Sequence, residues 1–335
     1  MQREQTAIPR LTLERGDPLV PCAYAEGLKD RWGRRIQSCG EKVKHSPNHL
    51  CPNCGHRLVK ANPPPPGPDS RVIDGNAAIV DSLTGKVVAL HIVCATDLAT
   101  DLAASLSQVK FDDQVFSNVT TTSRLSGLAS THRTFGYQPP VPMRRRYGCS
   151  RSQFNSEYPQ AMEQIAQFCR VAEHVFRTHA SDVHDITAQK VRDAIPPAWL
   201  IAGTPWSSGI INKTVSLPYH RDSANISSSW SAMLVCRRQV EGGLLHLADY
   251  DTYFTVPHGS ISIFDGQSIT HGVTPMRMLS PAGFRYSMVV YAKSGMRKCC
   301  ADPSQEGRRA ALEATEAEDR RAAGYKVARK PRRYA

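Results

Sequence analysis

The sequence predicts an α+β protein whose core is a double-sheet β-barrel or jelly roll. From residue 231 onward, short strand-like runs alternate with Gly, Pro and Asp: SAMLVC, LLHL, TYFTV, SISIF and FRYSMVVYA. Several short strands at this spacing are typical of that architecture. Earlier, AAIVD and VVALHIV flank the turn-like SLTGK and predict a hairpin. Residues 158–180 predict a helix packed on a sheet, because apolar side chains recur three and four positions apart. These are Met162, Ile165, Phe168, Val171, Val175 and Phe176.

The order of segments predicts three parts. The run NPPPPGP at 62–68 reads as a linker, because proline lacks an N–H and fixes its own φ. Residues 1–64 form a basic segment rich in cysteine, and residues 70–300 form the main domain. The tail, 301–335, predicts a charged helix with a basic end, and we expect it to be solvated because it has no apolar face.

Composition bounds the class of protein. The 335 residues are 41% hydrophobic, enough to bury a core, and no apolar run approaches the roughly 20 residues of a membrane span. The start, MQREQTAIPR, lacks the apolar core of a signal peptide. We therefore expect a soluble, intracellular monomer without a membrane partner, nuclear in a eukaryote and cytoplasmic otherwise.

Charge and cysteine content indicate partner and compartment. A formal net charge of +12 favours contact with a polyanion, nucleic acid first. Ten cysteines in a chain without a secretory signal predict free thiols or metal ligands in a reducing compartment, rather than a disulfide framework.

A candidate metal site lies in LPYHRDSANISSSW and FDGQSITHGVTP. His220 and Asp222 lie two positions apart, a spacing that points both side chains to one face of a strand, and His271 follows at the end of another strand-like segment. Two imidazoles and one carboxylate form the facial triad of non-haem Fe(II) oxygenases, which leaves coordination positions open. The alternative is a solvent-facing His220 and Asp222, with His271 in a turn and Arg285 paired at the surface.

A cosubstrate site is predicted on the strand that follows. Arg285 could form a two-pronged bond with a buried carboxylate, and Ser287, two positions along the same face, could add a hydroxyl.

The ordered set His220-x-Asp222, His271 and Arg285-x-Ser287 resembles the signature of 2-oxoglutarate- and Fe(II)-dependent dioxygenases. The surrounding text, SSGIINKTVSLPYHRDSANISSSWSAMLV, EGGLLHLADYD and SIFDGQSITHGVTP, resembles the TET/JBP family, over roughly residues 130–300. The resemblance implies a double-stranded β-helix core (jelly-roll, cupin-like) with supporting helices. It also implies Fe(II), 2-oxoglutarate and O2 as cofactor and cosubstrates, and oxidation of a methyl group on a base in nucleic acid.

Within the family, HRDSAN is similar to a TET motif whose asparagine bonds the flipped base, which makes Asn225 the candidate for base recognition. An Asx-turn is the structural alternative for Asn225. The resemblance favours hydroxylation of 5-methylcytosine in DNA, most simply in a duplex. Thymine hydroxylation of the JBP type, hydroxylation of a protein or small molecule, and an inactive DNA-binding module stay open.

Basic residues near these motifs are candidates for the DNA backbone. The run MRRRYGCSR supplies Arg144, Arg145, Arg146 and Arg151, and Lys213 and Arg221 lie near the metal motif. Solvated or ion-paired arginines are the alternative, and one of the set could instead hold 2-oxoglutarate.

The N-terminal segment is a candidate structural zinc site. Cys51 and Cys54 form the C-P-N-C-G turn of a zinc knuckle, and Cys22 and Cys39 could complete four sulfur ligands. His45 or His49 could replace a cysteine, and free cysteines are the alternative. Cys299 and Cys300 stay unassigned.

Overall fold

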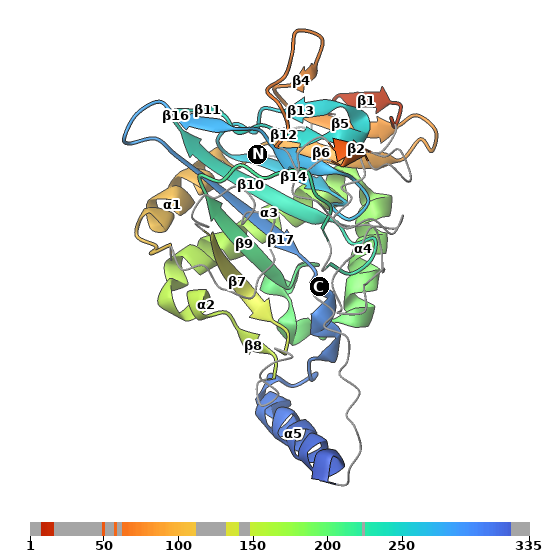
Figure 1. The fold of residues 1–335 in the computed structure, drawn as a ribbon, viewed down its shortest axis with the longest axis vertical. Coiled ribbons are helices and arrows are strands. Elements are labelled where there is room, and N and C mark those ends of the chain that lie inside the picture. Colours follow the sequence, from red (N-terminus) through yellow and green to blue (C-terminus); the bar gives the residue numbers. More distant parts are fainter. Residues whose placement is uncertain are drawn as a thin grey trace, which may run out of the picture.

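Two facing β-sheets form the core of the protein (Figure 1). The computed structural model describes residues 8–16, 49–50, 57–58, 62–111, 132–140, 148–222 and 225–322. In that part of the chain the larger sheet has nine strands. In their order across the sheet they are β1 (Arg10–Leu13), β5 (Ala77–Asp81), β6 (Val87–Val93), β14 (Ser260–Phe264), β10 (Ser231–Arg238), β17 (Phe284–Tyr291), β9 (Ser208–Lys213), β7 (His132–Gln138) and β8 (Ser150–Arg151).

The smaller sheet covers one face of the larger one. Its described strands, in order, are β15 (His271–Val273), β12 (Leu245–Leu247), β13 (Thr252–Phe254) and β4 (Arg71–Ile73). Two short pairs complete the strands: β11 (Val240–Gly242) with β16 (Met276–Met278), and β2 (His49–Leu50) with β3 (Arg57–Leu58). The predicted hairpin is confirmed, because β5 and β6 pair antiparallel.

Side chains of the larger sheet alternate between two apolar clusters, as the period of a strand requires. On β10, Leu234 and Cys236 pack among the helices, whereas Met233 and Val235 pack against Leu245 and other residues of the smaller sheet. Met233, Val235 and the other residues of their cluster therefore line the space between the two sheets. By the same alternation Arg285 and Ser287 on β17 belong to this inner face, opposite Arg237 and Val235 of β10.

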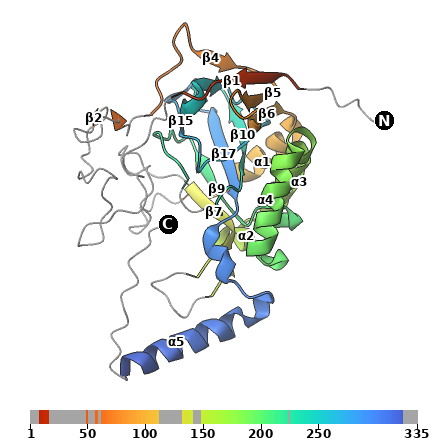
Figure 2. The same cartoon turned by 90° about the vertical axis from the view of Figure 1, so that its right-hand side faces the viewer.

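Helices cover the other face of the larger sheet (Figure 2). The described α-helices are α1 (Thr96–Ser107), α2 (Gln153–Glu157), α3 (Pro159–His179), α4 (Ser181–Ala194) and α5 (Glu306–Ala322). The helix predicted over 158–180 is confirmed as α3, whose Ile165, Phe168 and Phe176 are fully buried. No helix of the described chain combines the length and the apolar character that crossing a membrane requires.

The C-terminal helix α5 projects from the rest of the protein (Figures 1 and 2). Its first turn is nevertheless attached, because Glu306 is buried and accepts hydrogen bonds from the backbone N–H groups of Cys149 (2.8 Å) and Cys300. Ala310 is also buried. The expectation of a fully solvated tail is therefore wrong at its beginning.

A disulfide joins Cys149 to Cys299, and the expectation of free thiols is wrong for this pair. The two cysteines are 150 positions apart, but the fold brings their Cα atoms to 5.6 Å, within the usual span of a disulfide. The bond is packed among buried residues that include Trp199 and Met296. Among the described cysteines, Cys94, Cys169, Cys236 and Cys300 are free.

Between the sheets lies a buried histidine, His91, whose ring stacks on Phe254 and whose Nδ1 contacts the hydroxyl of Ser262 at 2.9 Å. Burial lowers the pKa of His91 to about 4. Because the folded pKa lies below the unfolded value of about 6.5, the unfolded chain binds more protons between these two pH values.

Acidification from pH 6.5 to 4 should therefore lower the free energy of unfolding by about 3 kcal/mol through His91. Urea unfolding of the metal-free protein at a series of pH values measures this loss. His91→Gln should remove that part of the pH dependence, whereas His174→Gln, at an exposed position of α3, should retain it. A His91→Gln protein with the full wild-type slope would contradict the assignment.

Candidate metal and cosubstrate site

Three potential metal ligands meet at one end of the space between the sheets. One ligand atom from each of His220, Asp222 and His271 lies within 4.8 Å of the other two. The Nε2 atom of His220 is 3.9 Å from Oδ1 of Asp222, and the centroids of the two imidazole rings are 4.3 Å apart. The structure thus brings together the three residues that the sequence predicts as a metal site.

The local backbone differs from the prediction. His220 and Asp222 do not lie on a strand; the chain is irregular there, and His220 forms an isolated antiparallel bridge with His271. Each of these histidines donates its backbone N–H to the other's carbonyl, at 2.8 and 3.0 Å. Asp222 N–H donates to the carbonyl of Gly266 at 2.8 Å. The ligands are therefore placed by backbone pairing between the segment of His220 and Asp222 and the segment of Gly266 and His271. The alternation of side chains along a single strand does not place them.

Hydrogen bonds fix the orientation of both imidazoles. Nδ1 of His220 lies 2.9 Å from the carbonyl of Pro218, and Nδ1 of His271 lies 2.9 Å from the carbonyl of Ile269. A carbonyl can only accept, so each Nδ1 carries the proton and each Nε2 presents a lone pair. Histidine ligands of metals typically have this arrangement.

The carboxylate of Asp222 is oriented from its other side. Oδ2 accepts a hydrogen bond from Nδ2 of Asn225 at 3.2 Å, and the hydroxyl of Ser231 lies at 3.5 Å. Gly266 allows the close approach of this group, because a Cβ there would lie 2.4 Å from Oδ2. Oδ1 is therefore the oxygen available to a metal, as a one-oxygen ligand.

The electrostatics suit a cation at the cluster. His271 is buried, and burial together with the neighbouring His220 lowers its pKa to about 4, against the opposing effect of Asp222. The ring is thus neutral near pH 7, as a metal ligand must be. Two imidazoles and one carboxylate, with His220 and Asp222 partly exposed, fit Fe(II) with positions left open.

A second feature of the inner space is a buried cation without a partner. Arg285 is fully buried, and its Nε and both amino groups have no hydrogen-bond partner among the residues that the structure describes. Burial, with a smaller effect from Arg237, lowers the pKa of Arg285 to about 9. Arg237, in contrast, donates to the backbone carbonyls of Thr255, Val240 and Gly242.

An unpaired buried guanidinium is costly and favours an anion that can accept two parallel N–H bonds. Gly243 lies against it: a Cβ there would be 3.1 Å from Cδ and Nε of Arg285. Ser287 is buried on the same face of β17. The donors present therefore fit the carboxylate of a bound dicarboxylic acid such as 2-oxoglutarate.

The residue predicted to read the base lies beside the metal cluster. Asn225 is buried and forms an isolated bridge with Lys293. Its Nδ2 donates to Asp222 and, at 3.1 Å, to the hydroxyl of Ser231. Lys293 donates from Nζ to Oε1 of Gln138 at 3.2 Å, and burial lowers the pKa of Lys293. Asn225 thus contacts a candidate metal ligand.

The candidate DNA-contacting residues have different surroundings. Arg221 donates from Nε to the hydroxyl of Thr270 at 3.0 Å, so it is partly engaged within the protein. The Lys213 ammonium lies over the ring of Phe111, and Arg151 is exposed on β8. Two groups lie outside the described residues: Arg144, Arg145 and Arg146, and the candidate zinc ligands Cys22, Cys39, Cys51 and Cys54.

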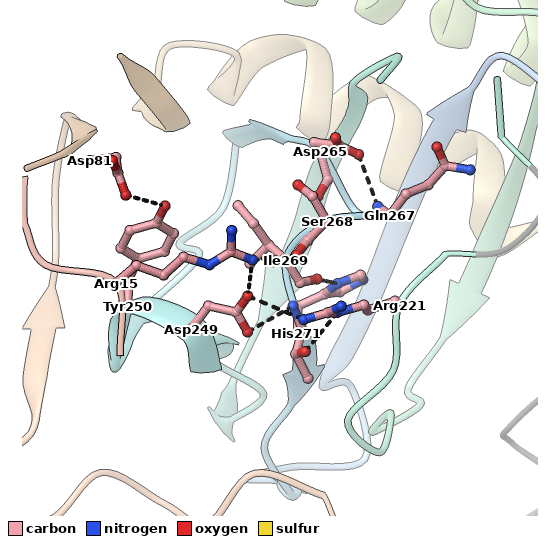
Figure 3. A network of polar contacts seen from close by, with 11 residues as sticks. Arg15, Asp81, Arg221, Asp249, Tyr250, Asp265, Gln267, Ser268, Ile269 and His271 are labelled. Carbon is pink, nitrogen blue, oxygen red and sulfur yellow. Dashed lines mark hydrogen bonds and ion pairs between the residues drawn. The ribbon is translucent and has the colours of Figure 1, made fainter. Parts of the chain in front are cut away.

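The sequence interpretation missed several polar residues of the site. Ser231 could have been found, because it shares the inner face of β10 with Met233 and Val235. The buried Asp249, which contacts Arg15, Arg221 and the segment before His271, carries no such signal (Figure 3).

Comparison with known proteins shows a similarity to one oxygenase family. Residues 142–294 match the Tet_JBP family, described as the oxygenase domain of the 2OGFeDO superfamily. A curated relative is the bifunctional helicase and thymine dioxygenase JBP2 of Trypanosoma brucei brucei (strain 927/4 GUTat10.1), 25% identical over 130 residues. The match covers 39% of this chain and 12% of the length of JBP2.

A solved structure, NgTET1 in complex with 5mC DNA, has a similar fold with a TM-score of 0.53 and 14% sequence identity. The superposition covers 75% of this chain and 89% of NgTET1. The expected double-stranded β-helix core with supporting helices is thereby confirmed. Residues 142–294 are thus similar to the oxygenase domain of the TET/JBP family, and the fold is similar to that of NgTET1.

Proposed function

We propose that this protein is an Fe(II)- and 2-oxoglutarate-dependent dioxygenase that hydroxylates the methyl group of 5-methylcytosine in DNA. The observation that carries the proposal is that a candidate metal site and a candidate carboxylate site both face the space between the two sheets. The His220, Asp222 and His271 cluster lies at one end, and Arg285, a buried cation without a described partner, lies on the same inner face of the larger sheet.

A methyl C–H offers no acidic proton, so acid-base groups alone cannot react with it; bound iron, 2-oxoglutarate and O2 supply the oxidant. The protein's residues bind and orient. His220 Nε2, Asp222 Oδ1 and His271 Nε2 would hold Fe(II), while Arg285 and Ser287 would bind the distal carboxylate of 2-oxoglutarate. The hydrogen bonds to Pro218 and Ile269 keep both imidazoles in the coordinating tautomer.

The choice of cytosine rests on the orientation of Asn225. Because its NH2 group donates to Asp222 and Ser231, its carbonyl oxygen is the atom left to face a ligand. An acceptor there suits the exocyclic amine of cytosine, whereas the corresponding O4 of thymine also accepts. Lys293, across the bridge from Asn225, adds a donor that suits N3 or O2 of cytosine.

The nucleic acid is expected to be double-stranded DNA from which the target base is flipped, at a cost of a few kcal/mol repaid in the pocket. Support comes from the net charge of +12, from exposed Arg151 and from NgTET1, which was solved with 5mC DNA. Thymine in DNA is the second candidate substrate, since JBP2 is a thymine dioxygenase.

Mass spectrometry of nucleosides tests the proposal, after incubation with duplex DNA that contains 5-methylcytosine or thymine as its only methylated base. We expect 5-hydroxymethylcytosine and stoichiometric succinate. Equal oxidation of the thymine-only duplex would contradict the choice of cytosine. The absence of both products, with DNA binding retained, would instead indicate an inactive binding module.

Asn225→Ala should lower kcat/KM for 5-methylcytosine. The expected loss of transition-state stabilisation is about 1 to 3 kcal/mol. Because Asn225 also contacts Asp222, the assay needs saturating Fe(II), and the ratio of cytosine to thymine products is the decisive readout. That ratio should fall towards one. Gln189→Ala, which removes an exposed amide on α4, is the matched control and should leave the ratio unchanged.

A further inference from the structure

A buried carboxylate connects the two segments that carry the candidate metal ligands. Asp249 lies in a short 3-10 helix (Ala248–Tyr250) between β12 and β13, and its side chain is fully buried. Oδ1 accepts a hydrogen bond from Thr270 N–H at 3.2 Å, and Oδ2 is 3.5 Å from an amino group of Arg221. Figure 3 shows Arg221 directed at this carboxylate.

Both partners are next to metal-facing residues. Arg221 lies between His220 and Asp222, and Thr270 immediately precedes His271. Arg221 Nε also donates to the Thr270 hydroxyl at 3.0 Å, so the two segments contact each other directly as well as through Asp249. The backbone bridge between His220 and His271 lies next to this contact. A displacement of Asp249 would therefore alter the spacing of the three ligands.

The shortest contact of Asp249 comes from the N-terminal segment. Arg15 approaches Oδ2 at 2.6 Å, and the same amino group donates to the carbonyl of Ser268 at 2.8 Å (Figure 3). Ser268 lies in the turn that leads to His271. Arg15 follows β1, and Gly16 N–H donates to the carbonyl of Asp249 at 2.8 Å. These residues lie 126 or more positions before the matched range that begins at residue 142.

β1 holds Arg15 in place. The strand pairs in parallel with β5 in a continuous register from Arg10, opposite Ala78, to Leu13, opposite Asp81. The carbonyl of Leu13 also accepts a hydrogen bond from Ser82 N–H at 2.8 Å. Arg15 is therefore presented from the edge of the larger sheet to the loop between β14 and β15.

The charge balance explains why Arg15 matters. A fully buried carboxylate is stable only with close compensation, and removal of one partner leaves it unpaired. Arg221, at 3.5 Å, is a distant partner compared with Arg15 at 2.6 Å. Without Arg15, Asp249 would turn towards Arg221 or water, and its bond to Thr270 N–H would weaken.

We propose that Arg15 is a positioning residue of the metal site, which acts through Asp249 and Ser268 to set the place of His271 relative to His220 and Asp222. The N-terminal segment then contributes to the geometry of the metal site through Arg15. This inference rests on the proposed function, because it assumes that the cluster binds Fe(II).

Anaerobic titration of the full-length protein with Fe(II), in the presence of 2-oxoglutarate, tests it. Arg15→Met should raise the Kd for Fe(II) about 10- to 100-fold, the usual effect of losing a residue that orients metal ligands. Arg15→Lys should restore part of the affinity, because an ammonium can still reach a carboxylate. Arg10→Met, at an exposed position of β1, is the matched control and should bind like the wild type.

A second readout separates positioning from a general loss of structure. At saturating Fe(II), the KM for 2-oxoglutarate should stay within about threefold of the wild type in Arg15→Met, because Arg285 and Ser287 are held by β17. A wild-type Kd for Fe(II) in Arg15→Met, or an equal loss in Arg10→Met, would overturn the inference alone. Failure of the wild-type protein to bind Fe(II) would overturn the proposed function, and this inference with it.

Discussion

Loss of either partly exposed metal-facing side chain, in His220→Ala or Asp222→Ala, is expected to reduce base oxidation by at least about 10³-fold, or about 4 kcal/mol. The reason is that two ligands cannot retain the metal in a site built for three, while His271 is held by backbone pairing and remains in place. Anaerobic addition of Fe(II) and 2-oxoglutarate to the wild-type protein should give a weak visible charge-transfer band. The band should be absent from both variants.

The control is His174→Ala, which removes an exposed imidazole from α3 and should leave the band and the activity intact. Product analysis by mass spectrometry and the visible spectrum should agree for each variant. Survival of the band in both His220→Ala and Asp222→Ala would show that iron binds elsewhere.

Arg285→Met should have opposite effects on function and on stability. The affinity for 2-oxoglutarate should fall about 100-fold, or about 2.7 kcal/mol, because a two-pronged bond to a carboxylate is lost. The cosubstrate-free protein should become more stable by about 1 to 4 kcal/mol, because a buried guanidinium without a described partner is replaced by an apolar chain of similar length. Succinate formation measures the first effect and urea unfolding the second.

Arg237→Met provides the contrast on the neighbouring strand. Its guanidinium donates to three backbone carbonyls, so its removal leaves buried acceptors unpaired and should destabilise the protein. If Arg285→Met instead lowers stability and leaves the affinity for 2-oxoglutarate unchanged, Arg285 is a structural residue and the cosubstrate site lies elsewhere.

The sequence predicted the elements whose residues follow a simple period. The apolar spacing in 158–180 and the alternation in SAMLVC and FRYSMVVYA correspond to α3, β10 and β17. The strand predicted around His220 and Asp222 was wrong, because those residues are placed by pairing with His271 and with Gly266, some 40 to 50 positions later. Local pattern carries no information on such pairing.

Contacts between segments far apart in the chain likewise could not be predicted from the sequence. Arg15 and Asp249 are 234 positions apart, and nothing near either residue marks the other as a partner. The same holds for Cys149 and Cys299, where connectivity among ten cysteines cannot be deduced from spacing. The orientation of the Asn225 amide also needed the structure, because it depends on Ser231 and Asp222 together.

The position of β14 in the larger sheet bears on where this chain can be shortened for expression. β14 pairs with β10 on one side and with β6 on the other, and β6, β5 and β1 all precede the matched range 142–294. A fragment confined to that range would leave the edge of β14, SISIF, without a neighbour. An uncharged edge rich in isoleucine is a template for intermolecular strand pairing. The minimal folded unit is therefore longer than the matched range, because it must include β6.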